Sequence, residues 1–329
     1  MKARSLSLAG VGLLLSTMGA VAWEPTKSVE IIVPFGPGGA SDQMARTIQA
    51  IIQKYNLSTQ SFIVVNKPAA TGGEAMLDMK KAKGDAHKLL TTSSTIYMTP
   101  LATGIPVTWH DMTPVGMVAQ DEFLVWVNKD APYKTLKDLA EAAKVAKPPL
   151  KIGGGGSKRE DELVTYGMWK ELGAPVSYIP YKSGGEASTQ LAGNHTAAET
   201  NNPSEDVANW RAGMTRPLCV LSEKRISYTG KITADFAWSD VPTCKEQGLS
   251  FTYNMLRGLF MPGGVTKEQQ AYFVDLLNKV VATPEWKDYL ERNALLPDVR
   301  TGKEYTDFLT ADENKHKTLM GDAGFLAKK

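Results

Sequence analysis

A glycine-rich turn joins an apolar β-type segment to a helical pattern in residues 31–55, IIVPFGPGGASDQMARTIQAIIQKY. Its glycines, Gly36, Gly38 and Gly39, allow the backbone to approach a ligand closely. Ser41 has methionine rather than Glu or Gln three residues later, so no capping box forms and the first N–H groups of the helix stay free. A helix N-terminus carries partial positive charge and outward donors, so the turn predicts an anion site, most naturally for a carboxylate.

Three further helix starts have a glycine-bearing entry and read Ser/Thr-x-x-Glu: residues 71–74, 157–160 and 183–186. This pattern predicts capping boxes and sharply defined helix starts. One glycine turn alone is more often an ordinary connector of α/β folds, but recurrence in both halves favours a shared anion site. The glycine spacing matches neither a P-loop nor a dinucleotide fingerprint, which disfavours phosphate and nucleotide ligands.

Other polar and aromatic residues near these turns have two interpretations each. Lys182 either neutralises a bound carboxylate or is a solvated lysine at a loop end. Phe35, Tyr97 and Tyr181 either wall the pocket or are core aromatics. Asn201 and Asn202 either donate to the ligand or cap a turn.

The sequence offers no catalytic or metal-binding motif. The four histidines have no tight metal-ligand spacing, and there is no G-x-S-x-G elbow. We therefore expect no metal and no cofactor, and a binding function rather than an enzyme. The alternatives are an exported enzyme acting on a carboxylate or ester, and a structural or adhesive surface protein.

The first 22 residues have the pattern of a cleaved signal peptide. Lys2 and Arg4 precede an uncharged stretch, residues 6–22, that ends in the small-residue pattern before a cleavage site expected after Ala22. The alternative is a membrane anchor, which the short and polar-interrupted stretch disfavours. Removing two of 37 basic residues leaves 35 against 35 acidic residues, so the mature chain is neutral and a nucleic-acid partner is not expected.

Two cysteines, Cys219 and Cys244, fit an exported protein in which a disulfide is permitted. They are either bonded to each other or buried free thiols. Their spacing excludes a CxxC redox or zinc motif.

Strand and helix patterns alternate along the chain, which predicts two α/β units, each a mainly parallel sheet flanked by helices. Ligands of such sheets lie beyond the carboxyl ends of the strands, so two facing units define one cleft. The expected strands are 29–35, 61–66, 87–94, 122–128, 150–156 and 176–181, and the segment 257–264 follows in the tail. The expected helices are 40–55, 75–83, 135–146, 157–172, 184–191, 266–295 and 301–320.

Several ordered motifs together resemble the TctC, or Bug, family of extracytoplasmic solute receptors of tripartite tricarboxylate transporters. The resemblance covers nearly the whole mature chain. It rests on AWEPTKSVEIIVPFGPGGASDQMAR, VVNKPAATGGEAMLDMKKAKGDAHKLL, DMTPVGMVAQDEFLVWVNKDAPYKTLKDL, GGGGSKREDE, YIPYKSGGEASTQLAGNHTAAETNNPSE, DVPTCKEQG and RGLFMPGGVTKEQQAYFVDLL.

The resemblance implies a two-lobe periplasmic binding protein of type II (a Venus flytrap). It implies a discontinuous first lobe, residues 23–120 and 226–329, a second lobe, residues 121–225, and hinges near 120 and 225. It also implies that the lobes close on a small carboxylate, which is a di- or tricarboxylate or an aromatic acid. The receptor is expected to be a periplasmic monomer that delivers this ligand to membrane permease subunits. The expected ligand residues are Phe35, Gly36, Gly38, Gly39, Ala40, Ser41, Asp42, Ser93, Ser94, Thr95, Gly154, Gly155, Gly156, Ser157, Tyr181, Lys182, Ser183, Gly184, Asn201 and Asn202.

Overall fold

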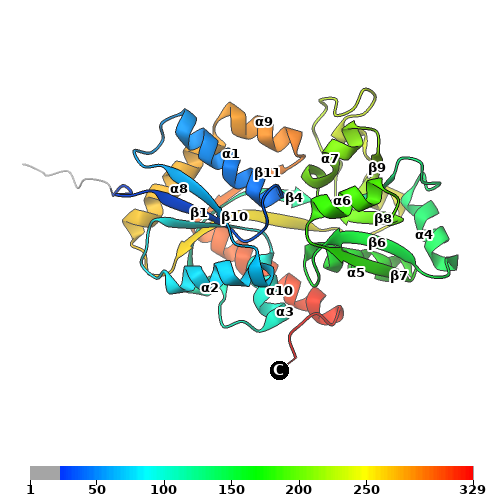
Figure 1. Ribbon diagram of the computed structural model, residues 1–329, viewed down its shortest axis with the longest axis horizontal. Coiled ribbons are helices and arrows are strands. Elements are labelled where there is room, and N and C mark those ends of the chain that lie inside the picture. The colour runs from blue at the N-terminus through cyan, green and yellow to red at the C-terminus, as the bar shows by residue number, and fades with distance from the viewer. Residues whose placement is uncertain (1–22, 329) are drawn as a thin grey trace, which may run out of the picture.

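The computed structural model describes residues 23–328 as two lobes, each built on its own sheet (Figure 1). The expected signal peptide, residues 1–22, lies outside the described residues. Within the described chain, no helix has the length and apolar character needed to span a bilayer. The two-lobe α/β architecture predicted from the sequence is confirmed.

The first lobe contains a six-stranded sheet in the order β11-β4-β10-β3-β1-β2. Its strands are β1 (Val29–Val33), β2 (Phe62–Asn66), β3 (Lys88–Thr92), β4 (Met112–Glu122), β10 (Asn254–Pro262) and β11 (Leu296–Thr301). Its helices are α1 (Ala40–Lys54), α2 (Gly73–Lys81), α3 (Thr95–Thr103), α8 (Lys267–Val281), α9 (Pro284–Arg292) and α10 (Gly302–Asp322).

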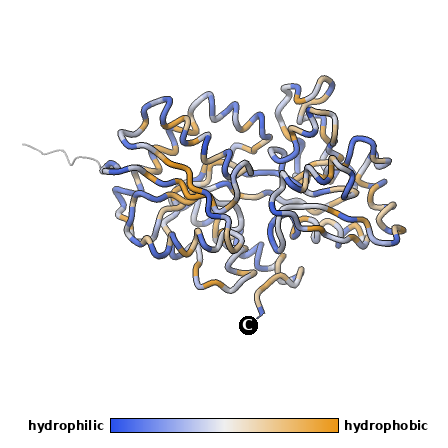
Figure 2. The backbone as a smooth tube through the Cα atoms, in the orientation of Figure 1, coloured by the Kyte–Doolittle hydropathy of each residue, from blue (hydrophilic) through white to orange (hydrophobic). Residues whose placement is uncertain are grey.

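Strand β1 shows why its sequence is apolar on both faces. Ile31 packs in one cluster with residues of α1, α8 and α9, whereas Ile32 packs in another with residues of α2, α3 and α10. Successive strand side chains point to opposite faces, so a strand covered by helices on both sides reads as a continuous apolar run. Figure 2 shows this hydrophobic colour along the central strands of the left-hand lobe.

The second lobe contains a five-stranded sheet in the order β7-β6-β8-β5-β9. Its strands are β5 (Leu124–Asn128), β6 (Leu150–Gly155), β7 (Val176–Tyr181), β8 (Ala198–Asn201) and β9 (Thr215–Val220). Its helices are α4 (Leu136–Val145), α5 (Glu160–Leu172), α6 (Gly184–Ala192) and α7 (Pro203–Arg211).

Both sheets are mixed: most strands of each run in one direction, as expected of mainly parallel sheets, and the others are antiparallel to them. In the first sheet, β1 pairs parallel with β2 and β3, but β10 is antiparallel to β3 and β4, and β11 is antiparallel to β4. In the second, β6 is parallel to β7 and β8, whereas β5 is antiparallel to β8 and β9. The strands of opposite direction are β10 and β11 in the first sheet and β5 in the second, and β5 and β10 are the strands that follow the two crossings between the lobes.

The chain first crosses between the sheets at Phe123, the residue between β4 and β5. It returns through residues 221–253, and much of this segment packs on the second lobe. Trp238 lies 6.3 Å from Trp126 of β5, between ring centroids, and Cys244 is disulfide-bonded to Cys219 of β9. The cysteine pair is therefore bridged. We propose on this packing that the second lobe extends to about residue 250, beyond the expected boundary at 225.

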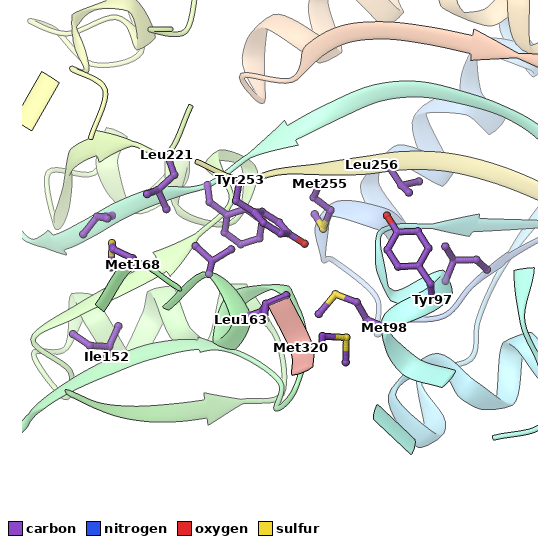
Figure 3. Close-up of a cluster of buried hydrophobic side chains, with 14 of the residues drawn as sticks. Tyr97, Met98, Ile152, Leu163, Met168, Leu221, Tyr253, Met255, Leu256 and Met320 are labelled. Atoms are coloured by element: carbon purple, nitrogen blue, oxygen red, sulfur yellow. The ribbon is translucent and has the colours of Figure 1, made fainter. Parts of the chain in front are cut away.

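A continuous apolar core joins the two lobes behind the cleft. Figure 3 shows Tyr253 and Leu221 of the return segment beside Leu163 and Met168 of α5. Tyr97 and Met98 of α3, Met255 of β10 and Met320 of α10 belong to the same cluster. The two lobes therefore share one apolar core.

Candidate functional site

A cavity of about 110 Å³ lies between the two lobes. The first lobe lines it with the β1–α1 turn and the β3–α3 junction. The second lobe lines it with the loops after β6, β7 and β8. Twelve of the expected ligand residues line it: Phe35, Gly36, Gly39, Ala40, Ser41, Ser93, Gly155, Lys182, Ser183, Gly184, Asn201 and Asn202.

The other expected residues do not line the cavity: Gly38, Asp42, Ser94, Thr95, Gly154, Gly156, Ser157 and Tyr181. Some of them shape it indirectly. Gly38 has φ +84°, a left-handed conformation that favours glycine, and Tyr181 accepts a hydrogen bond from the Gly156 N–H, with N···O 2.7 Å. Ser157 instead donates from its hydroxyl to Glu162, with O···O 2.9 Å.

Sequence reasoning missed nine lining residues: Pro34, Pro68, Thr71, Arg159, Glu160, Asp161, Glu205, Met255 and Arg257. Thr71 and Glu160 were noticed only as members of capping-box patterns. Glu205, Met255 and Arg257 carry no local signal, because helix α7 and strand β10 reach the cleft only through the tertiary fold. Charged groups are prominent in this missed set.

The turn before α1 differs from expectation because some of its N–H donors are already occupied. The Ala40 N–H donates to Glu205 Oε1 of the second lobe, with N···O 3.1 Å. The Gly38 N–H donates to Asp42 Oδ2 of its own helix, with N···O 2.9 Å. In this structure, two donors of the predicted anion site therefore hold carboxylates of the chain itself.

The start of α3 repeats this arrangement. Glu160 Oε1, from the first turn of α5, accepts from the Thr95 N–H at 3.0 Å and from the Ser93 hydroxyl at 2.7 Å. The Glu160 side chain is only 3% exposed. A second-lobe carboxylate therefore lies at a first-lobe helix start.

Two of the three expected capping boxes are wrong. Helix α2 begins at Gly73, and Thr71 has φ +57°, so it cannot cap that helix. Helix α5 has Arg159 as its N-cap, and Glu160 is engaged across the cleft. At α6 the Ser183 side chain does accept from the Glu186 N–H, so this cap is confirmed, while Glu186 reaches back to the Lys182 N–H.

The glycine run of β6 is explained by close packing in the second lobe. A Cβ on Gly154 would lie 2.7 Å from the Tyr178 hydroxyl, and one on Gly155 would lie 2.9 Å from the Gly184 backbone nitrogen. Gly155 also donates from its N–H to Asp161 Oδ2 at 2.5 Å. Glycine is therefore required there so that the α6 start can approach β6.

Cationic groups face the same cavity. Arg159 places its guanidinium 4.5 Å from the Phe35 ring centroid, across the cleft. Its Nε is buried without a hydrogen-bond partner in the described chain. Lys182 is exposed at the rim, so both residues are available to a carboxylate.

The two asparagines lie at the end of β8 and line the cavity. Asn201 donates from Nδ2 to the Gly184 carbonyl at 3.0 Å, and Asn202 donates to the Glu122 carbonyl at 2.9 Å. Their amides thus brace the α6 start and the β4–β5 crossing.

Burial dominates the titration of the acidic groups at the site. It raises the pKa of Asp161 to about 7, with further repulsion from Glu160 and Glu205 and opposition from the Gly155 N–H. Burial also raises the pKa of Glu205, although the Ala40 N–H opposes the rise. The cavity therefore disfavours the ionised forms of these two acidic side chains.

Residues 44–325 match the model of the tripartite tricarboxylate transporter family receptor. Protein BugT of Bordetella pertussis is 28% identical over 254 residues, which are 73% of this chain and 73% of that protein.

Two solved structures share the fold. MatC from Rhodopseudomonas palustris, with bound malate, has a TM-score of 0.77 at 20% identity, over 90% of this chain and 99% of its own. An R. palustris protein with adipate has a TM-score of 0.79 at 23% identity, over 91% of this chain and 98% of its own.

Proposed function

The chain belongs to the tripartite tricarboxylate transporter receptor family, and from this premise we propose that it captures a small organic carboxylate between its two lobes. The observation that carries the proposal is the interlobe cavity, where the starts of α1 and α6 from opposite lobes both contribute lining residues. N–H groups at helix starts are ready donors for an anion. Arg159 and Lys182 add positive charge to the same cavity.

A short dicarboxylate is the ligand class that the site favours. Donors of the first lobe lie at two separate places, the start of α1 and the start of α3, and a ligand with two carboxylates reaches both. Two structures that share the fold hold malate and adipate, which are both dicarboxylates. The contacts made by both ends favour lobe closure, because only the closed state provides them together.

The receptor works outside the cytoplasm and passes its ligand to permease subunits of a tripartite transporter. The support is the family and the signal-peptide pattern of residues 1–22. The mature chain acts as a monomer in this scheme, with the closed form docking on the permease.

A thermal-shift screen of the mature protein against mono-, di- and tricarboxylates and aromatic acids tests the proposal. A ligand that binds the folded state raises the melting temperature by mass action, in proportion to the logarithm of its concentration. We expect saturable stabilisation by at least one short dicarboxylate, confirmed by calorimetry. The ligand recovered after incubation must be chemically unchanged, since turnover would show an enzyme, and stabilisation by no acid in the panel would refute the proposal.

A further inference from the structure

Two carboxylates of the second lobe occupy the places where a ligand's carboxylates are expected. Glu205 lies in the first turn of α7 and Glu160 begins α5. Each accepts a hydrogen bond from a helix-start N–H of the first lobe, Ala40 and Thr95 respectively. Both contacts cross the cleft.

The Glu205 carboxylate is held between the glycine loops of both lobes. One oxygen accepts from Ala40 and would lie 3.5 Å from a Cβ on Gly39, while the other would lie 3.5 Å from a Cβ on Gly185 at the start of α6. Two helix N-termini from opposite lobes therefore face one carboxylate. This is the environment that anion recognition by helix starts requires.

The Glu160 carboxylate makes the second bridge. Its Oε1 accepts from both the Ser93 hydroxyl and the Thr95 N–H, at 2.7 and 3.0 Å. Its nearest cation, Arg159, places Nε 3.9 Å from Oε2, beyond hydrogen-bonding distance. The partners that hold Glu160 are thus neutral donors of the first lobe.

We propose that Glu160 and Glu205 are built-in competitors of the ligand, which hold the empty cleft closed until two ligand carboxylates displace them. This inference rests on the proposed function for the identity of the ligand, but the closure of the empty protein is independent of it. Together with Arg159 stacked on Phe35, the two carboxylates tie the lobes at three places. Displacement returns each glutamate to water or to its own lobe.

The competition makes these glutamates specificity-determining residues. A monocarboxylate displaces one glutamate and leaves the other bound, so it replaces one of the two bridges. A dicarboxylate long enough to reach from Ala40 to Thr95 replaces both. Selection of dicarboxylates over monocarboxylates then follows from the displacement itself, without further arginines.

Small-angle X-ray scattering of the ligand-free mature protein tests the closure. The E160A/E205A variant is expected to have a larger radius of gyration than the wild type, because both bridges are removed. E162A is the matched control: Glu162 lies in the same helix α5, but it accepts only from Ser157 and Lys158 of its own lobe. Equal radii for all three proteins, each shown to be folded by circular dichroism, overturn the proposal.

Calorimetry with adipate as the probe tests the competition. Removing a competing charged acceptor is expected to tighten adipate binding about tenfold for E205A, because the ligand then no longer displaces a charge-assisted hydrogen bond. Weaker or unchanged adipate binding by E205A overturns the proposal, because Glu205 then does not compete with the ligand for the same donors. If no acid binds any variant, the proposed function fails while the scattering comparison still decides the closure.

Discussion

Arg257 and Asp121 form a buried ion pair between β10 and β4, the strands that lead toward the second lobe, with Nε···Oδ2 3.0 Å. Arg257 is 4% exposed and Asp121 is 1% exposed. Nη2 of Arg257 also donates to Asp121 Oδ2. The remaining nitrogen, Nη1, donates to the Ser41 hydroxyl at the start of α1, at 2.9 Å. The pair therefore links the strands behind the cleft to the turn that forms its first-lobe wall.

Replacing Asp121 with alanine is expected to lower the free energy of unfolding by about 3–5 kcal/mol, because the Arg257 charge is left buried without its partner. Urea unfolding at neutral pH measures the loss. Asp288→Ala is the control, since Asp288 pairs with Arg292 on the surface, where both side chains are at least 60% exposed. Equal stability of the two variants would contradict the buried pair.

Glu122 gives the protein a pH dependence of known sign. It lines a separate cavity of about 460 Å³ beside the crossing strands, and burial raises its pKa from 4.5 to about 7. Glu122 therefore contributes to the stability of the folded state below pH 4.5. This contribution is lost as the pH rises through 7, because the folded state must then bury a charged carboxylate. We expect Glu122→Gln to raise the free energy of unfolding by about 3 kcal/mol at pH 8.

The gain from Glu122→Gln should shrink steadily as the pH falls from 8 to 5. The comparison of variant and wild type cancels the titration of other buried groups. Denaturant unfolding at several pH values provides the measurement. A gain that stays constant with pH would show that the effect is one of packing.

The disulfide between Cys219 and Cys244 encloses a sequence separation of 25 residues. Closing a loop of this size stabilises a folded protein by about 2–4 kcal/mol in the chain-entropy description. The variant with both cysteines replaced by alanine should lose that amount in urea unfolding. Reductant should destabilise the wild type to a similar extent and leave the variant unchanged; a stability of the wild type that ignores reductant would count against the effect.

Gly39 tests the first-lobe wall without straining the backbone. Its φ of −75° suits any residue, and a Cβ there would meet Glu205 Oε1 at 3.5 Å, an ordinary contact. Gly39→Val adds an isopropyl side chain in the space of the carboxylate, so we expect loss of carboxylate binding with little change in the melting temperature of the empty protein. Gly39→Ala is the milder control, and undiminished affinity in the valine variant would place the ligand elsewhere.

Local features of the sequence determined the elements and the turns. The alternating strand and helix patterns predicted β1, α1, β6 and α6 within a few residues, because periodicity and end signals act over one or two turns of chain. The Ser183 cap was predicted for the same reason, since its donor is only three residues away. The glycines of the β1–α1 turn likewise identified one wall of the cavity.

Tertiary structure decided which groups meet in the cleft. Glu205 is 165 residues from Ala40 and Glu160 is 65 residues from Thr95. No local pattern could show that these carboxylates would occupy the donors that looked free in the sequence. The mixed strand directions were also decided by tertiary structure, because the direction of β10 between β3 and β4 depends on where the chain returns from the second lobe. Short-range propensity fixes an element, whereas long-range packing selects its partners.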